Sequence, residues 1–297
     1  MKNRDAFSSF HPALLFLYYA LILIFSMFLT HPLCGAGSFL GAVWYLARLN
    51  GFGAVKKALK WAAPVWLLAA GVNVLFNHEG ATILTYFSSG NPLTLESALY
   101  GLSAGGMIVL VLLWFQSYQA VMSAEKFVYL FGRVAPALSL VLAMILRFVP
   151  KFQAQLRAVG QARSMMGGEK RGFAQKVRES VTNFSILVTW SLENAVETAD
   201  SMRARGYGLP GRTAFSIFRF EKRDRALLGW MLLLAAAVIG AWAGGAFAWR
   251  YYPTVRGSFT GWSAAGAAAE LLLALTPAAA DAAEAMRLRS AAGEAER

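Results

Sequence analysis

Long apolar runs without a single charged side chain constrain this chain more than any other feature. Five such runs cover residues 13–30, 33–47, 61–76, 99–122 and 226–249. A helix of about 20 apolar residues crosses a bilayer while satisfying its own peptide groups, which the hydrocarbon cannot do. Hydrophobic residues make up 57% of the chain and charged residues 15%. We therefore predict an all-α polytopic membrane protein.

A sixth apolar run, at residues 261–280, leaves two interpretations open. It contains Glu270, and an acid at the centre of a bilayer costs about 2.5–3.5 kcal/mol. The run is either a sixth transmembrane helix or a helix that lies in the membrane interface. An acid inside a membrane segment is a functional candidate, although we favour a structural role for Glu270. With this run, about six transmembrane helices are expected.

The basic residues predict how the chain is oriented. Four segments that would face one side hold 26 of the 28 Lys and Arg residues: 1–12, 48–60, 123–225 and 281–297. Cytoplasmic segments carry such an excess, so the sequence predicts a multi-pass protein of the cell membrane with both termini in the cytoplasm. The net charge of +12 then indicates topology and contact with anionic membrane lipid. It does not require a nucleic-acid partner.

The same map predicts three regions. Residues 1–122 would form an N-terminal membrane domain of four spans, and residues 226–297 a C-terminal membrane hairpin with a short cytoplasmic tail. Residues 123–225 lie between them and carry 17 of the basic residues, so we expect long helices on the cytoplasmic face.

Three helical pieces are predicted in this middle region. Residues 136–150 lie between two prolines and are too short to span, so they should lie along the inner face or re-enter it. Residues 151–166 form a polar helix that ends at Gly167 and Gly168. Residues 176–205 form a long helix with one apolar face, which ends at Gly206 and Gly208.

The last two pieces end in similar motifs. One reads QARSMMG (161–167) and the other RARGYG (203–208), which places Arg163 and Arg205 42 residues apart in equivalent positions. A plain interpretation is that both are ordinary helix ends, because arginine complements the helix dipole and glycine terminates a helix. Two matching ends are a more specific signal than one.

Neighbouring charges distinguish the arginines. Arg203 has Asp200 three residues before it, so we expect these two to pair along the helix. Neither Arg205 nor Arg163 has an acid three or four residues before it. We expect both guanidinium groups to be unpaired and available for directional bonds to carboxylates or carbonyls of a partner.

Catalytic and metal sites are not predicted. The three histidines, His11, His31 and His78, lie in separate segments and form no ligand cluster. Two of them precede proline, which indicates turns at span boundaries. The sequence lacks a glycine-rich phosphate loop with Lys-Ser/Thr, so no cofactor is expected and any ATP hydrolysis must occur in another chain.

At this point the chain resembles a known family, the transmembrane T component of energy-coupling factor (ECF) transporters, the ABC-type importers of vitamins and metal ions. The resemblance covers most of the chain and is carried by FHPALLFLYY, NVLFNHEGATIL, RFVP and the two arginine motifs. The most specific piece, ADSMRARGYG, is close to the second Ala-Arg-Gly signature of the family. The first motif departs from that signature and reads Ala162-Arg163-Ser164.

The resemblance implies a scaffold that couples ATP hydrolysis to transport rather than an enzyme. The helix ends would dock in two ABC-type ATPase subunits, and the apolar faces of 136–150 and 181–199 would hold a substrate-binding membrane S component. The arginines would enter the ATPase grooves, the alanines would permit close approach, and Ser164 and Gly206 would form the turns. The implied docking residues are Ala162, Arg163, Ser164, Arg203, Ala204, Arg205 and Gly206.

Two other functional classes are also compatible with a membrane protein. A self-contained secondary transporter or channel remains an alternative, but it would need polar groups that face a pathway in several spans. The five runs without charge argue against it. A lipid-modifying membrane enzyme would need a convergent acid, base or metal pattern, and the sequence offers none.

Overall fold

The chain folds into two compact units built almost wholly of helices. The computed structural model describes residues 5–86, 91–132, 135–165, 172–210, 218–257 and 259–295. These ranges contain ten α-helices, a short 3-10 helix and one pair of strands, so the predicted all-α polytopic membrane fold is confirmed. Residues 1–123 and 218–297 make up the first unit, and residues 124–217 make up the second.

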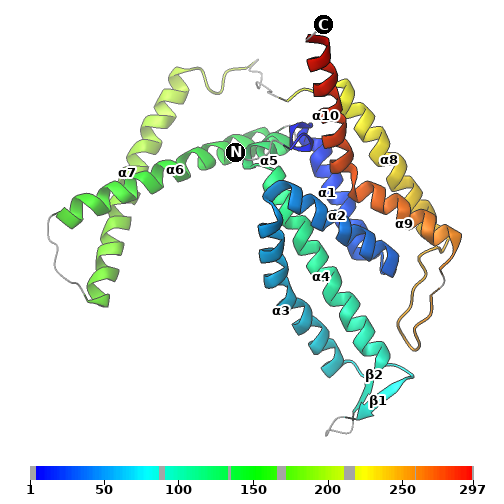
Figure 1. The fold of residues 1–297 in the computed structure, drawn as a ribbon. Coiled ribbons are helices and arrows are strands. Elements are labelled where there is room, and N and C mark those ends of the chain that lie inside the picture. Colours follow the sequence, from blue (N-terminus) through cyan, green and yellow to red (C-terminus); the bar gives the residue numbers. More distant parts are fainter. Residues whose placement is uncertain are drawn as a thin grey trace. The chain divides into compact units, whose positions relative to one another are not determined.

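The first unit combines N-terminal and C-terminal segments of the chain (Figure 1). Its N-terminal elements are η1 (Phe7–Ser9), α1 (Pro12–Phe28), α2 (Pro32–Asn50), α3 (Phe52–Phe76), β1 (Ile83–Tyr86), β2 (Pro92–Thr94) and α4 (Leu95–Val121). Its C-terminal elements are α8 (Lys222–Ala243), α9 (Gly261–Ala274) and α10 (Thr276–Ala295). The antiparallel strands β1 and β2 form the hairpin between α3 and α4.

Two histidines begin helices in this unit, as their His-Pro pairs predicted. The side chain of His11 accepts a hydrogen bond from the amide of Ala13, and that of His31 accepts one from the amide of Leu33, both at 3.3 Å. The proline that follows each histidine occupies the first helical position, where a missing N–H costs nothing. These caps fix where α1 and α2 start.

Aromatic side chains fill the core where α1, α2 and α4 meet. Tyr18, Tyr19 and Trp114 are fully buried and contact one another edge to face. The indole N–H of Trp114 donates to Ser38 Oγ at 3.0 Å, and Ser38 also pairs with Ser26 at 2.9 Å. The buried polar groups therefore cross-link three helices, which favours one fixed arrangement of them.

The structure shows which helices qualify as membrane spans by length and composition. Within the described residues, α3, α4, α8 and a helix of the second unit, α6 (Pro136–Met165), are long and apolar enough to cross a membrane. The pair α9 and α10, bent by 53°, would make a fifth. Helix α1 is also apolar and has 17 residues, at the lower limit of the roughly 17–25 residues that a span needs, so about six spans remain the expectation.

Glu270 is buried inside the first unit. It lies on α9, where only 1% of its surface is exposed, and Cys34 of α2 is beside it. The two helices cross closely: a Cβ at Gly41 of α2 would lie 2.5 Å from that of Ala274. The enclosed position fits the structural role that we favoured for this acid.

The second unit contains α5 (Ala124–Gly132), α6 and α7 (Phe173–Ala204). The prediction of two separate helices at 136–150 and 151–166 is wrong, because α6 is a single helix of 30 residues that contains Pro150 in its interior. For the same reason, the expectation that 136–150 is too short to span no longer holds. Gly167 and Gly168, which were expected to end the second piece, lie outside the described residues.

Helices α6 and α7 cross each other and run antiparallel (Figure 1). Lys151 contacts α7 at Asn194, and Arg163, later in α6, contacts it at the earlier residue Asn183. Near one crossing point, Lys151 Nζ donates to Asn194 Oδ1 at 2.6 Å and lies 5.2 Å from the ring centre of Trp190. Phe152 contacts the same ring edge to face. A cation, an amide and two aromatic rings therefore hold the two helices together.

Candidate partner-docking site

The second arginine motif forms a rigid end to α7. Arg205 is the C-cap, and Gly206 follows in a left-handed conformation with φ of +78°. The amide of Gly206 donates to the carbonyl of Arg203, and the amide of Tyr207 donates to that of Met202, both at 3.0 Å. This pair of bonds is a Schellman motif, which satisfies the last carbonyls of the helix. The predicted glycine stop at Gly206 is confirmed.

Both arginines at this end of α7 are exposed. The side chain of Arg205 makes no hydrogen bond or ion pair with any residue that the structure describes, as predicted. The expected pairing of Arg203 with Asp200 is wrong, because these two side chains are likewise unpaired in the described part of the chain. A pair across one turn of an exposed helix is worth only ~0.3–0.5 kcal/mol, too little to hold two long side chains together.

Arg163 differs from Arg205, and the prediction that it is unpaired is wrong. It lies in the last turn of α6, and its Nη1 donates to Asn183 Oδ1 at 2.7 Å and to the backbone carbonyl of Glu179 at 3.3 Å. Both acceptors belong to α7. A guanidinium has five N–H donors, so three remain after Nη1 is satisfied. Arg163 is therefore held in place by its own hairpin yet keeps Nε and Nη2 for further contacts.

The neighbours of Arg163 are exposed. Ala162 and Ser164 both face solvent, and Ser164 Oγ donates to the carbonyl of Gln161 at 2.7 Å. Ser164 is still helical, so the expectation that it forms the turn is wrong; α6 extends to Met165. A serine that donates to a carbonyl three residues back stays compatible with a helix, unlike the glycine of the second motif. Ala204 is exposed in the last helical position of α7.

The two motifs lie far apart along α7, although the first belongs to α6. Arg163 contacts α7 at Glu179 and Asn183, whereas Arg205 caps the other end of that helix. Twenty-two residues separate Asn183 from Arg205, which corresponds to about 33 Å at the rise of an α-helix. The structure thus presents two cationic helix ends, one beside the first half of α7 and one at its C-terminal end.

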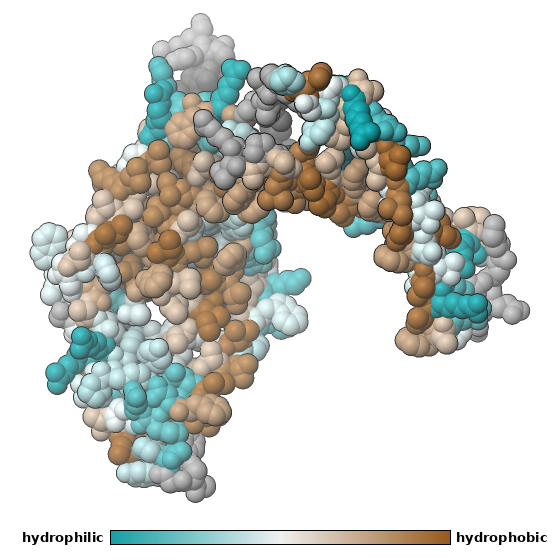
Figure 2. Space-filling model, turned by 180° about the vertical axis from the view of Figure 1, so that it is seen from behind, coloured by the Kyte–Doolittle hydropathy of each residue, from teal (hydrophilic) through white to brown (hydrophobic). Residues whose placement is uncertain are grey.

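One face of α7 is apolar and uncovered. The sequence predicted Val181, Phe184 and Leu192 on a common face. Each of these side chains is more than 60% exposed. The opposite side, which faces α6, carries polar groups such as Asn183 and Asn194. Hydrophobic side chains are also widespread on the visible surface of both units (Figure 2). An apolar stripe of this kind is suited to lipid or to an apolar protein partner.

Two functional contacts were missed at the sequence level. Asn183 and Asn194 hold Arg163 and Lys151, and neither pairing is visible from local spacing because the partners are 20 and 43 residues apart. A signal does exist: both are amides within the mostly apolar middle of α7. Amides in such positions often bind a neighbouring helix.

The described residues contain no group of three or more potential metal ligands. The arrangement can offer directional cationic donors and an apolar surface, which are the properties of a contact site.

Comparison with known proteins identifies two similar sequences. The energy-coupling factor transporter transmembrane protein EcfT of Lacticaseibacillus paracasei is 36% identical over 106 residues, and EcfT 1 of Listeria monocytogenes is 33% identical over 106 residues. In both cases the match covers 34% of this chain and 40% of the relative. No family model matches the chain. The resemblance expected from the arginine motifs is therefore confirmed: over about a third of its length, this chain is similar to the EcfT transmembrane component of energy-coupling factor transporters.

Proposed function

We propose that this protein is the transmembrane coupling component of an ECF-type importer. It would pass the conformational change of two ABC-type ATPase subunits to a substrate-binding S component in the membrane. The observation that carries the proposal is the pair of arginine-tipped helix ends, spaced about 33 Å apart along α7. The similarity to two EcfT proteins supports it. ATP hydrolysis would then occur in the partners.

Each helix end would enter a groove of one ATPase subunit. Arg205 offers a free fork of donors that fits a carboxylate or adjacent backbone carbonyls, with Arg203 beside it as a second cation. Arg163 offers Nε and Nη2 from a position already fixed by Asn183. Ala162 and Ala204 leave room for close approach, while Gly206 ends the helix and Ser164 lies just beyond Arg163.

The hairpin of α6 and α7 would transmit the movement of the ATPase subunits to the S component. Its two helices are linked by Arg163 with Asn183 and by Lys151 with Asn194. A change in separation of the two ATPase sockets would therefore move the helices together rather than bend them apart. The apolar stripe of α7 at Val181, Phe184 and Leu192, with the apolar part of α6, would carry that movement to the S component.

The direction of transport and the membrane orientation belong to the same proposal. With both termini and both motif ends in the cytoplasm, the ATPases would bind on the side where 26 of the 28 basic residues lie. Anionic lipids would contact the same side. A vitamin or a metal ion would be imported, and the S component would determine which one.

The test measures binding of purified ATPase subunits to the protein in lipid nanodiscs. Arg205→Glu should weaken binding about 10- to 100-fold, because each charge-assisted hydrogen bond contributes roughly 1.5–3 kcal/mol. Arg205→Lys keeps the charge but loses the planar fork, so an intermediate loss is expected. Arg163→Glu should weaken binding as well.

Arg157→Glu is the matched control. It makes the same charge reversal on α6, at an exposed arginine whose Nε donates only to the carbonyl of Gln153, away from both helix ends. Binding should be unchanged in this variant. Equal losses for Arg157→Glu and Arg205→Glu would reduce the effect to net charge and overturn the docking role. Uptake by vesicles that contain no ATPase subunit would favour the secondary-transporter alternative, for which Glu270 would be the first residue to test.

A further inference from the structure

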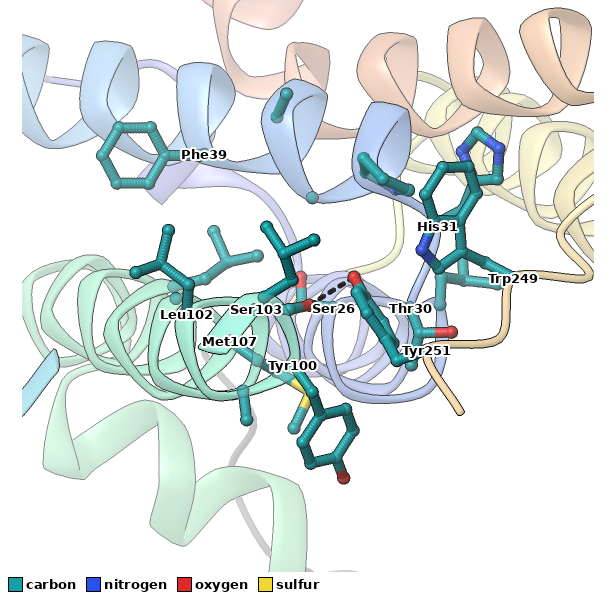
Figure 3. A pocket seen from close by; sticks show the side chains of 18 of the residues that line it. Ser26, Thr30, His31, Phe39, Tyr100, Leu102, Ser103, Met107, Trp249 and Tyr251 are labelled. Atoms are coloured by element: carbon teal, nitrogen blue, oxygen red, sulfur yellow. Dashed lines mark hydrogen bonds between the residues drawn. The ribbon is translucent and has the colours of Figure 1, made fainter. Parts of the chain in front are cut away.

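A pocket of about 570 Å³ lies within the first unit, which does not contain the arginine motifs. Its walls come from the end of α1, the start of α2, Trp66 of α3, the N-terminal half of α4 and the loop after α8 (Figure 3). Leu99, Tyr100 and Leu102 line it and are each 37–51% exposed, so the pocket reaches the outer surface of the helices. The volume is within the usual range of about 300–1,000 Å³ for small-molecule sites.

The lining is apolar along most of its length and polar at one end. Phe39, Leu102 and Met107 lie towards one side, and Ser26, Ser103 and Tyr251 towards the other (Figure 3). Most polar atoms at that end already have partners: Tyr251 donates to Ser103 Oγ at 2.9 Å, and Ser26 pairs with Ser38. A ligand would therefore be mostly hydrocarbon.

One donor at the polar end is unsatisfied. The indole N–H of Trp249 is buried and has no acceptor among the described residues. Its ring nitrogen is on the side of the indole nearer Ser26 and Tyr251 (Figure 3). A buried donor without an acceptor is costly, so an acceptor on a bound molecule would be stabilised there.

The position in the membrane indicates which molecule that is. The pocket borders residues 99–110 of α4, a 27-residue helix about 40 Å long, on the half nearer the β1–β2 hairpin. The pocket consequently lies between the interface and the midplane of one leaflet, where lipid is the solvent. Trp249, Tyr251 and Tyr100 at its rim are the residue types that favour the level of the lipid carbonyls.

We propose that this pocket binds one acyl chain of a membrane phospholipid, whose ester carbonyl accepts the hydrogen bond of Trp249. The chain lies along Phe39, Leu102 and Met107. The pocket shares no residue with the ATPase-docking motifs, so the lipid site and the proposed function are tested by separate experiments. Under the predicted orientation, it belongs to the outer leaflet.

Two glycines allow the pocket to be filled without disturbing its walls. A Cβ at Gly35 would meet nothing within 4 Å, and one at Gly106 would meet only Trp66 Nε1 at 3.8 Å. Leucine at either position also favours a helix over glycine. The control is Gly229→Leu, which adds the same side chain to α8 at an exposed position with nothing within 4 Å and outside the pocket.

The experiment uses the full chain in bilayers that contain phosphatidylglycerol with a photoreactive diazirine on one acyl chain. After illumination, labelled peptides are mapped by mass spectrometry. Label should concentrate in residues 32–39 and 99–110, and Gly35→Leu or Gly106→Leu should reduce it at least fivefold, while Gly229→Leu leaves it unchanged. Trp249→Phe should lower pocket labelling about fivefold, which corresponds to the loss of one neutral hydrogen bond.

Other outcomes would overturn the proposal. Label spread evenly over exposed lipid-facing residues such as Leu67 and Leu233 would show that no chain is retained in the pocket. Pocket labelling that is unchanged by both leucine variants would exclude this cavity as the binding site. Because Gly35 and Gly106 lie on different helices, an equal loss of labelling in both variants argues against misfolding of either one. Labelling by a photoreactive free fatty acid but not by the phospholipid would assign the acyl chain to another source.

Discussion

The two motif arginines are held in different ways, and this difference has functional consequences. Arg205 projects from a helix end whose backbone is closed by a Schellman motif, so its side chain is free while its base is fixed. Arg163 is fixed at the side chain itself by Asn183. A free arginine side chain loses rotamer entropy when it docks, whereas that of Arg163 has already lost part of this entropy on folding. Replacement of Asn183 should thus affect docking only at the Arg163 end.

Gly206 is the residue on which the shape of the α7 end depends most. Its φ of +78° disfavours other residues, and an added Cβ would lie 3.0 Å from Leu209 Cδ1. Gly206→Ala should destabilise this end by about 1–2 kcal/mol and increase amide hydrogen exchange at Tyr207. Gly160→Ala in α6 is the control, because its Cβ meets nothing and alanine favours a helix. Equal exchange in the two variants would contradict the account.

Asp5 should make stability depend on pH. Burial, above all, raises its pKa to about 6, with Asp281 nearby adding to the shift and the hydrogen bond from Tyr45 at 2.7 Å opposing it. Arg48 is the cation in this cluster, 3.7 Å from Asp281. Between about pH 4 and 6 the folded chain binds more protons than the unfolded one, so this group lowers stability as pH rises through that window.

The substitution Asp5→Asn removes the carboxyl group whose protonation makes stability depend on pH. The thermal midpoint of the variant should vary less between pH 4 and 7 than that of the parent, and it should be higher than that of the parent at pH 7. Unfolding in detergent, followed by circular dichroism at several pH values, measures this. An unchanged pH profile would show that Asp5 does not retain its proton in the folded chain.

Among the helices, α2 and α9 cross closely enough at Gly41 for a substitution to test the contact. A Cβ at Gly41 would lie 2.5 Å from Ala274 Cβ, so Gly41→Ala should force the helices apart and cost about 1–3 kcal/mol. Gly35→Ala, on the same helix with open space around it, should be neutral or stabilising. Thermal unfolding of both variants in one detergent compares them directly. A Gly41→Ala variant as stable as Gly35→Ala would show that this crossing is not close.

The helices themselves were largely predictable, and their interactions were not. Runs without charge, the two His-Pro pairs and the glycine after Arg205 are local signals, and each marks a helix or one of its ends. Pro150 misled the prediction because local rules treat proline as a break, whereas α6 accommodates it. The pairing of Arg163 with Asn183 depends on how two helices meet, which no local pattern encodes.

At the level of the whole molecule, charge and hydropathy predicted a multi-pass membrane protein, and the long apolar helices of the structure bear this out. Hydropathy responds to composition along the chain and does not specify how the helices meet. The pocket beside Trp249 was not predicted either, because its lining comes from four helices and a loop distant in sequence. The arginine motifs, by contrast, were found from sequence because each is local.

The mass of the intact complex tests the central claim most directly. The protein is co-expressed with its ATPase subunits, purified in detergent and measured by native mass spectrometry, for the parent, Arg163→Glu, Arg205→Glu and the double variant. The account predicts one chain with two ATPase subunits for the parent, a reduced share of that complex for each single variant, and free chain for the double variant. Two ATPase subunits retained by the folded double variant would contradict it.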